Sequence, residues 1–190
     1  RLTGAWSFFD FKHYNVDVDQ NMNLIEYKSS SGFDIYVKAL DRGWHIAPTF
    51  GGDEHNNQWG TVQPHVTGIW AEALTREDIY EALRNRQTYV SVDRNFKMVF
   101  SANGQMMGSI LPADTEEITI QIVLNDPDLE DTIDRVVLYK NGGEIVQEYT
   151  NINSNQFSIE ETFASEDGDY FFVRAFQKDD DEAISAPIWI

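Results

Sequence analysis

The fold is decided by the stretch ITIQIVL, residues 118–124, in which apolar and polar side chains alternate over most of the length. Alternation with a period of two is typical of a half-buried β-strand. Residues 135–140 and 144–149 have the same character on either side of Asn-Gly-Gly at 141–143. Asn-Gly tolerates positive φ at both central turn positions and closes a tight hairpin. This part of the chain is therefore expected to be antiparallel.

Four more segments after residue 95 resemble strands, and turn signals separate them at intervals of about ten residues. They are residues 97–101, 156–160, 169–176 and 186–190. Roughly seven short strands with this spacing favour a small antiparallel β-sandwich of the Ig-like kind.

The first half of the chain mixes strands with helices. Residues 23–27 and 45–50 favour short strands, and residues 33–42 between them favour a helix that stops at Gly43. Strand, helix and strand within about thirty residues have the size of a βαβ unit. A second helix is expected after Thr75, whose side chain can cap it. Two such strands cannot close a barrel, so the first half looks incomplete as an independent α/β domain.

The composition excludes several classes of protein. The chain of 190 residues has 14 Lys and Arg against 32 Asp and Glu, a net charge of −18, which disfavours nucleic-acid partners. It has no Cys, so disulfide scaffolds and Cys-ligated zinc sites are excluded. No apolar run is long enough to span a membrane, and residues 1–5 lead into no apolar segment typical of a signal peptide.

The two halves differ in their charge and in their aromatic residues. The first 95 residues hold 9 basic and 13 acidic side chains, and the last 95 hold 5 and 19. All four His and four of the five Trp lie in the first half. We therefore place a domain boundary near residue 95, with one domain at 1–95 and the other at 96–190.

The segment TFGGDEHNN, residues 49–57, carries the strongest chemical signal. In α/β folds, functional groups lie where strands end at the carboxyl edge. Two glycines allow a sharp turn, and Asp53 and His55 at spacing i, i+2 can present a carboxylate and an imidazole to one side. This pair suits Zn²⁺, Mn²⁺ or Fe. The alternative is a turn in which Asp53 caps backbone amides and His55 is a surface residue.

The same segment resembles the Asp-x-His motif of the PHP-type (polymerase and histidinol phosphatase domain) metallohydrolases. The similarity to their CehA/McbA-like branch covers roughly residues 20–145. It is carried by the segments GGDEHNNQWG (51–60), TGIWAE (67–72), LTRE (74–77), EALRNRQTY (81–89) and NGQMMGS (103–109).

The resemblance implies an α+β chain in two parts: the C-terminal portion of a PHP-like α/β barrel, followed by an accessory β-sandwich. It implies a bacterial extracellular or cell-surface hydrolase in which divalent metals activate water against a small-molecule or polymer phosphoester. Asp53 and His55 match the metal ligands of that family. The family's His-x-His is absent, so the chain is expected to be an inactive fragment whose partner is the missing N-terminal part of the same domain.

Other candidate residues are open to two interpretations. Glu26 could support the metal site or simply face solvent from its strand, and His65 could act near the site or serve only in packing. The acidic segments at 126–131 and 178–182 could bind Ca²⁺ through oxygen ligands, or they could be solvated loops. Neither segment has the glycine and spacing of an EF-hand.

Two other functions remain open for the chain. The sandwich could be a glycan- or cell-wall-binding module without catalysis, provided that its aromatic residues form an exposed platform. The candidates for that platform are Tyr139, Tyr149, Tyr170, Phe172 and Trp189, although strand alternation is expected to bury most of them. Alternatively, the sandwich could only brace the first half.

Overall fold

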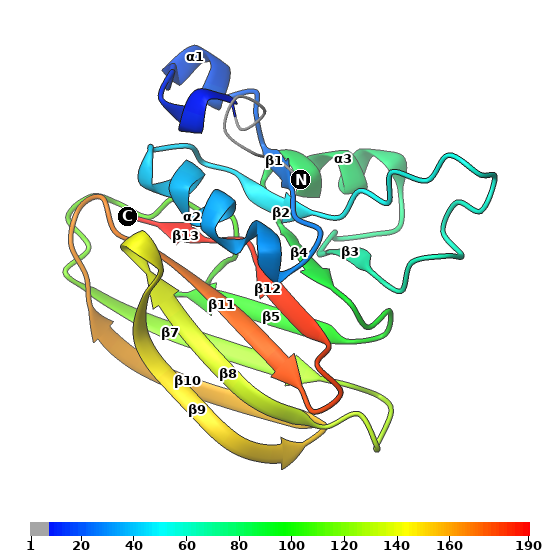
Figure 1. The fold of residues 1–190 in the computed structure, drawn as a ribbon. Helices are drawn as coiled ribbons and strands as arrows, with labels where there is room; N and C mark the ends of the chain where they lie inside the picture. The colour runs from blue at the N-terminus through cyan, green and yellow to red at the C-terminus, as the bar shows by residue number, and fades with distance from the viewer. Residues whose placement is uncertain (1–7) are drawn as a thin grey trace.

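Two antiparallel β-sheets packed face to face form most of the molecule (Figure 1). The structure is a computed structural model and describes residues 8–190. The expectation about a signal peptide concerns residues 1–5, which lie outside the described part.

The elements that follow are given in chain order. The strands are β1 (Leu24–Glu26), β2 (Ala47–Thr49), β3 (Val66–Ile69), β4 (Thr88–Ser91), β5 (Lys97–Ala102), β6 (Gln105–Met106), β7 (Glu117–Asn125), β8 (Ile133–Lys140), β9 (Glu144–Ser154), β10 (Gln156–Ala164), β11 (Tyr170–Gln177), β12 (Glu182–Ser185) and β13 (Ile188–Trp189). The helices are α1 (Val16–Asp19), α2 (Phe33–Asp41) and α3 (Arg76–Arg84), with 3-10 turns η2 (Phe8–Phe11), η3 (Ser30–Gly32) and η4 (Asn141–Gly143).

The stretch that decides the fold lies at the centre of the smaller sheet, whose order is β10-β7-β5-β6. Along β7, Ile118, Ile120, Ile122 and Leu124 are buried, while the residues between them are more exposed. The larger sheet has the order β3-β4-β12-β11-β8-β9, and β13 pairs with β11. The strands predicted after residue 95 are confirmed, and the Asn-Gly-Gly turn joins β8 to the antiparallel β9.

The larger sheet is covered on both faces. On one face, Val136 and Leu138 belong to the core shared with the smaller sheet. On the other, Val137 and Phe172 belong to a second core that includes Tyr36 of α2. Each fully buried apolar side chain contributes about 1.5–3 kcal/mol to the free energy of folding. Burial on both faces explains why almost all of β11 is inaccessible to solvent.

The predicted fold class, an α+β chain that begins with a portion of a PHP-like α/β barrel, is wrong. Strands make up 41% and helices 17% of the structure, the two main sheets are antiparallel, and no barrel is closed among the described residues. The reason lies in β3 and β4, which pair antiparallel with each other, while β4 also pairs with β12. These strands extend the sandwich and leave β1 and β2 as a separate pair. A sandwich-like second half is compatible with the structure.

The proposed boundary near residue 95 falls between β4 and β5. The pairing of β4 with β12 crosses it, so strands from both halves share one sheet. The division into 1–95 and 96–190 stays a prediction.

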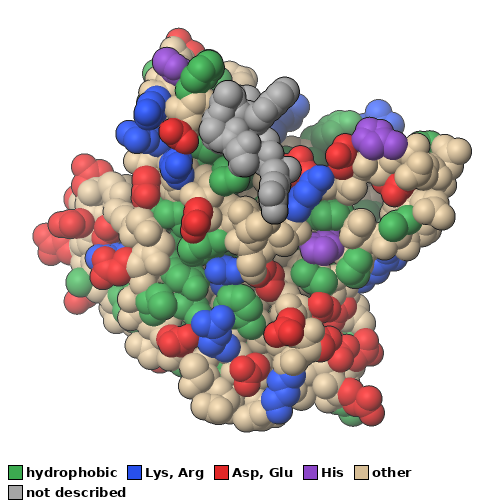
Figure 2. Space-filling model, viewed as in Figure 1, with side chains coloured by type: hydrophobic (Ala, Val, Ile, Leu, Met, Phe, Trp, Pro, Cys, Tyr) green, Lys and Arg blue, Asp and Glu red, His purple; other side chains and the backbone are tan. Residues whose placement is uncertain are grey.

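The surface is predominantly anionic. Figure 2 shows Asp and Glu side chains spread over one face of the molecule, with fewer Lys and Arg side chains among them. This agrees with the net charge of −18. Within residues 8–190, none of the helices has the length and apolar character that crossing a membrane requires.

Candidate metal centre

The candidate site lies at the end of a two-stranded parallel sheet. β1 and β2 pair in parallel, with Leu24 opposite Ala47 and Glu26 opposite Thr49, and α2 lies between them in sequence. The predicted strand, helix and strand are therefore confirmed. Because the strands are parallel, their carboxyl ends meet at one edge, which brings Glu26 and the segment after β2 together.

The predicted ligands meet at this edge. The Nε2 atom of His55 lies 2.9 Å from Oδ1 of Asp53. Between the strands, the Nζ atom of Lys28 lies 3.2 Å from Oε1 of Glu26 and 3.9 Å from Oδ2 of Asp53. Lys28 therefore contacts both carboxylates, and the imidazole of His55 is bonded to one of them. No sequence pattern indicated that Lys28 would lie here.

The surroundings of Asp53 favour its charged form. The hydrogen bond from His55 and then the charge of Lys28 hold the pKa of Asp53 below its usual range. The side chains of Asp53 and His55 are 68% and 80% exposed, so their ion pair adds little to stability.

The glycine turn predicted before Asp53 has a specific steric purpose. A Cβ added at Gly51 would lie 3.1 Å from Cδ of Glu26, which is tighter than ordinary contact. Gly51 therefore lets the loop after β2 pass close to the Glu26 carboxyl group. Asp53 then adopts a left-handed backbone with φ of 47°, which turns the chain back. Asp tolerates this conformation better than most residues.

His65 lines a pocket beside the site. The pocket has a volume of about 310 Å³, and its lining includes Phe50, Asp53, Trp59 and His65. The His65 ring stacks on Phe50, with 4.8 Å between the ring centroids and 13° between the planes. Burial lowers the pKa of His65. The structure thus places His65 in the same pocket as one predicted ligand.

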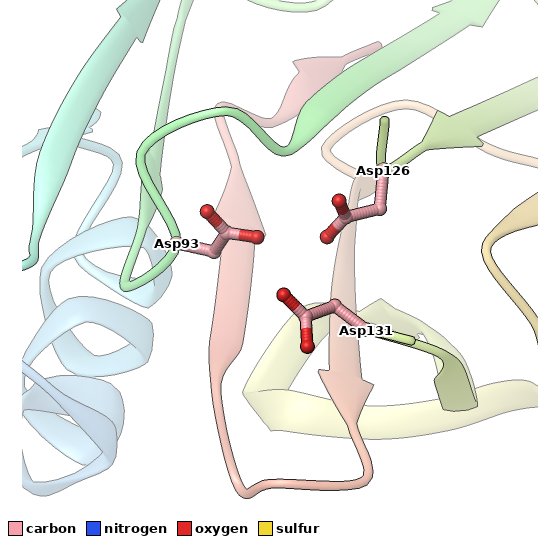
Figure 3. Close-up of side chains that lie close together, drawn as sticks. All are labelled: Asp93, Asp126 and Asp131. Atoms are coloured by element: carbon pink, nitrogen blue, oxygen red, sulfur yellow. The ribbon is translucent and has the colours of Figure 1, made fainter. Parts of the chain in front are cut away.

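A second cluster of carboxylates, the acidic cluster, consists of Asp93, Asp126 and Asp131 (Figure 3). One carboxylate oxygen of each lies within 4.8 Å of the others, and the three side chains point toward one another. Asp93 lies in the loop after β4, and Asp126 and Asp131 lie in the loop between β7 and β8. The acidic run at 126–131 is visible in the sequence, whereas only the tertiary fold brings Asp93 close to it.

Asp126 is the buried member of the acidic cluster, with 0% of its surface exposed. It accepts hydrogen bonds from Nε2 of Gln177 at 2.6 Å and from the backbone N–H of Asp128 at 2.8 Å. Burial, followed by a hydrogen bond with Asp93, raises the pKa of Asp126 to about 6. The three carboxylates offer oxygen ligands of the kind that Ca²⁺ prefers, and they can equally share a proton.

We expect the raised pKa of Asp126 to make folding stability depend on pH. The folded state binds this proton more tightly than the unfolded chain does, where the pKa is about 3.9. The stabilising contribution is complete below the unfolded pKa and is lost as pH rises through about 6. As pH rises from 5 to 7, the free energy of unfolding of the unaltered chain, measured in urea, should therefore fall by about 1 kcal/mol more than that of Asp126→Asn. The exposed Asp128→Asn is the control, and an identical pH profile for Asp126→Asn and the unaltered chain would contradict this expectation.

Comparison with known proteins identifies no family. No protein-family model matches the chain, and a search of curated proteins found no match. The resemblance to PHP-type metallohydrolases therefore stays a hypothesis, and the functional argument depends on the site itself.

Proposed function

We propose that this chain contributes part of the divalent-metal site of a metal-dependent hydrolase that acts on phosphoesters. One observation carries the proposal: beyond the carboxyl ends of two adjacent parallel strands, Asp53 and His55 are hydrogen-bonded to each other, and Lys28 links Asp53 to Glu26. Lys28, placed near both carboxylates, marks the position that suits a cation. Ligand sites in sheets with parallel strands typically lie at this edge.

The donor set fits a transition metal better than Mg²⁺ or Ca²⁺. An imidazole nitrogen together with carboxylate oxygens suits Zn²⁺, Mn²⁺ or Fe. In this proposal Asp53 and His55 hold the metal directly, and Glu26 orients or completes the ligand set. Lys28 then moves out toward solvent, which its 49% exposed side chain allows. When bound, such a metal supplies the activation of water for attack on phosphorus.

The three residues alone form an incomplete hydrolytic centre. Catalytic zinc sites use three protein ligands and keep one position open, and two-metal sites need more. The proposal therefore assigns the remaining ligands to protein outside these 190 residues. Weak metal binding without hydrolysis is the behaviour expected of the chain on its own.

The sandwich is less suited to the alternative function, glycan or cell-wall binding. Four of the five aromatic side chains considered for a binding platform are buried: Tyr139, Tyr170, Phe172 and Trp189. The fifth, Tyr149, packs against Phe157 with 5.2 Å between the ring centroids. These residues therefore serve packing, and no observation on the described surface favours the alternative.

Removing the ligands should weaken metal binding. Titration calorimetry with Zn²⁺ and with Mn²⁺ is expected to show that Asp53→Ala and His55→Ala each bind the metal at least about ten-fold more weakly than the reference chain. His13→Ala removes an exposed imidazole elsewhere and should change nothing. Every protein in this comparison, including the reference, also carries Asp131→Asn, so that the acidic cluster contributes equally to all of them. Equal affinity in all variants would remove both residues from the proposed function.

A further inference from the structure

His65 is held in place by the start of β3. The backbone N–H of Phe50 donates to Oγ1 of Thr67 at 2.8 Å, and Oγ1 of Thr49 lies 3.2 Å from the same atom. These bonds fix the segment after β2 against the first residues of β3. His65, directly before β3, is thereby stacked on Phe50 at 4.8 Å between the ring centroids. The imidazole is a positioned group in the wall of the pocket.

The surroundings of the ring indicate which nitrogen carries the proton. Nδ1 of His65 is buried and has no hydrogen-bond partner within the described residues. A buried unpaired N–H group is rarer in proteins than a buried unpaired acceptor, so the proton belongs on Nε2. Burial also lowers the pKa of His65, which favours the neutral form of the ring. A neutral imidazole with its proton on Nε2 is a hydrogen-bond donor at that atom.

The pocket has no strong anion-binding group of its own. Its lining includes the carboxylate residues Asp53 and Glu54, and these repel a free phosphate. A divalent cation at Asp53 would reverse that balance and draw a phosphoryl oxygen into the pocket. Of the residues that line the pocket, His65 supplies an imidazole donor, while Trp59 uses its indole N–H to bond the backbone oxygen of Glu54 at 2.9 Å.

We propose that His65 is a substrate-binding residue that donates a hydrogen bond from Nε2 to a phosphoryl oxygen of the substrate. This inference rests on the proposed function, because the phosphoryl group enters only when a metal is bound beside Asp53. It predicts that phosphate binding requires both the metal and the His65 donor, and that metal binding requires Asp53 but not His65.

The test measures inorganic phosphate binding to the 190-residue chain in the presence and absence of saturating Mn²⁺, followed by ³¹P relaxation. All proteins carry Asp131→Asn, and circular dichroism verifies their folding. His65→Phe keeps the ring stacked on Phe50 and removes the donor, so the affinity for phosphate should fall about ten-fold, as expected for a lost hydrogen bond to a charged group. His65→Gln retains an N–H donor and should recover part of the loss.

The outcomes separate the two proposals. Unchanged Mn²⁺ affinity with weaker phosphate binding in His65→Phe supports the role of His65. Unchanged phosphate binding in His65→Phe overturns that role and leaves the metal site standing. Failure of the unaltered chain to bind Mn²⁺ overturns both, and phosphate binding without Mn²⁺ contradicts the requirement for the metal.

Discussion

Glu182→Ala is expected to lower the free energy of unfolding by about 3–5 kcal/mol, because it leaves a buried guanidinium without its partner. Oε2 of Glu182 accepts from Nη2 of Arg174 at 2.8 Å, and both side chains are more than nine-tenths buried. Oε1 accepts from the hydroxyl of Tyr27 at 2.6 Å, and Ser30 also donates to this carboxylate. Chemical denaturation measures the loss.

The same substitution should disturb the candidate metal centre. Tyr27 directly follows β1, whose last residue is Glu26, so Glu182 anchors the segment that presents Glu26 and Lys28. We therefore expect weaker Zn²⁺ binding in Glu182→Ala even at temperatures where the variant is fully folded. The affinity of Glu182→Gln for Zn²⁺ should lie between that of the unaltered chain and that of Glu182→Ala, because a Gln side chain can keep one hydrogen bond to Tyr27.

An exposed ion pair provides the matched control. Nη1 of Arg135 lies 3.1 Å from Oε1 of Glu148, and their side chains are 37% and 38% exposed. Glu148→Ala should cost less than about 1 kcal/mol. The double variant Arg174→Met/Glu182→Met should recover much of the loss, because it removes the unpaired charge together with its partner. A loss in Glu182→Ala no greater than that in Glu148→Ala would contradict the burial argument.

Gly108→Ala is expected to destabilise the fold by about 3–5 kcal/mol through backbone strain and overpacking. Gly108 has φ of +92°, and an added Cβ would lie 2.2 Å from the backbone oxygen of Asn85. Its own N–H donates to the backbone oxygen of Pro187 at 2.7 Å, and its oxygen accepts from Nε of Arg86 at 3.1 Å. Hydrogen bonds thus join the turn after β6 to the residues after α3 and to the segment before β13.

Gly104→Ala separates the steric clash from the backbone conformation. Gly104 also has positive φ, at +74°, but an added Cβ would meet nothing within 4 Å. This variant should lose only about 1 kcal/mol, the cost of placing an L-residue in the left-handed region. Thermal and urea unfolding measure both variants. Equal losses at the two positions would show that the close approach of Gly108 to Asn85 is not what matters.

Local patterns predicted the strands with clear alternation or clear turns. β5 and β7 are confirmed near their predicted bounds, because one face of each strand meets the core and the other is more exposed. β8 is confirmed as well, although it is buried on both faces, because the turn after it marks its end clearly. β12 was missed because it begins at Glu182, at the end of an acidic run typical of a solvated loop. Only the tertiary pairing with Arg174 explains a buried Glu there.

The global fold depended on pairings that no local pattern specifies. β4 was missed, and its antiparallel pairing with β12 joins segments about ninety residues apart in sequence. This pairing is what replaces the predicted barrel portion. For the same reason Asp93 could not be assigned to the acidic cluster from the sequence, since its neighbours Asp126 and Asp131 lie in the distant loop between β7 and β8.

The candidate metal centre was more predictable because its residues are close in sequence. Asp53 and His55 are two residues apart, and a turn suffices to bring their side chains together. Glu26 lies at the end of the neighbouring parallel strand, which the predicted strand, helix and strand indicated. Lys28 was not predicted, because its role depends on distances to two carboxylates from different strands.

The position of a bound metal tests the central claim most directly. Crystals of the chain grown with Zn²⁺ and measured on both sides of the zinc absorption edge will locate the ion by its anomalous scattering. The proposed function predicts a peak within about 2.0–2.2 Å of a carboxylate oxygen of Asp53 and of a ring nitrogen of His55, with Lys28 displaced. A map without a peak at Asp53 and His55, in which Lys28 still lies between Glu26 and Asp53, would contradict it.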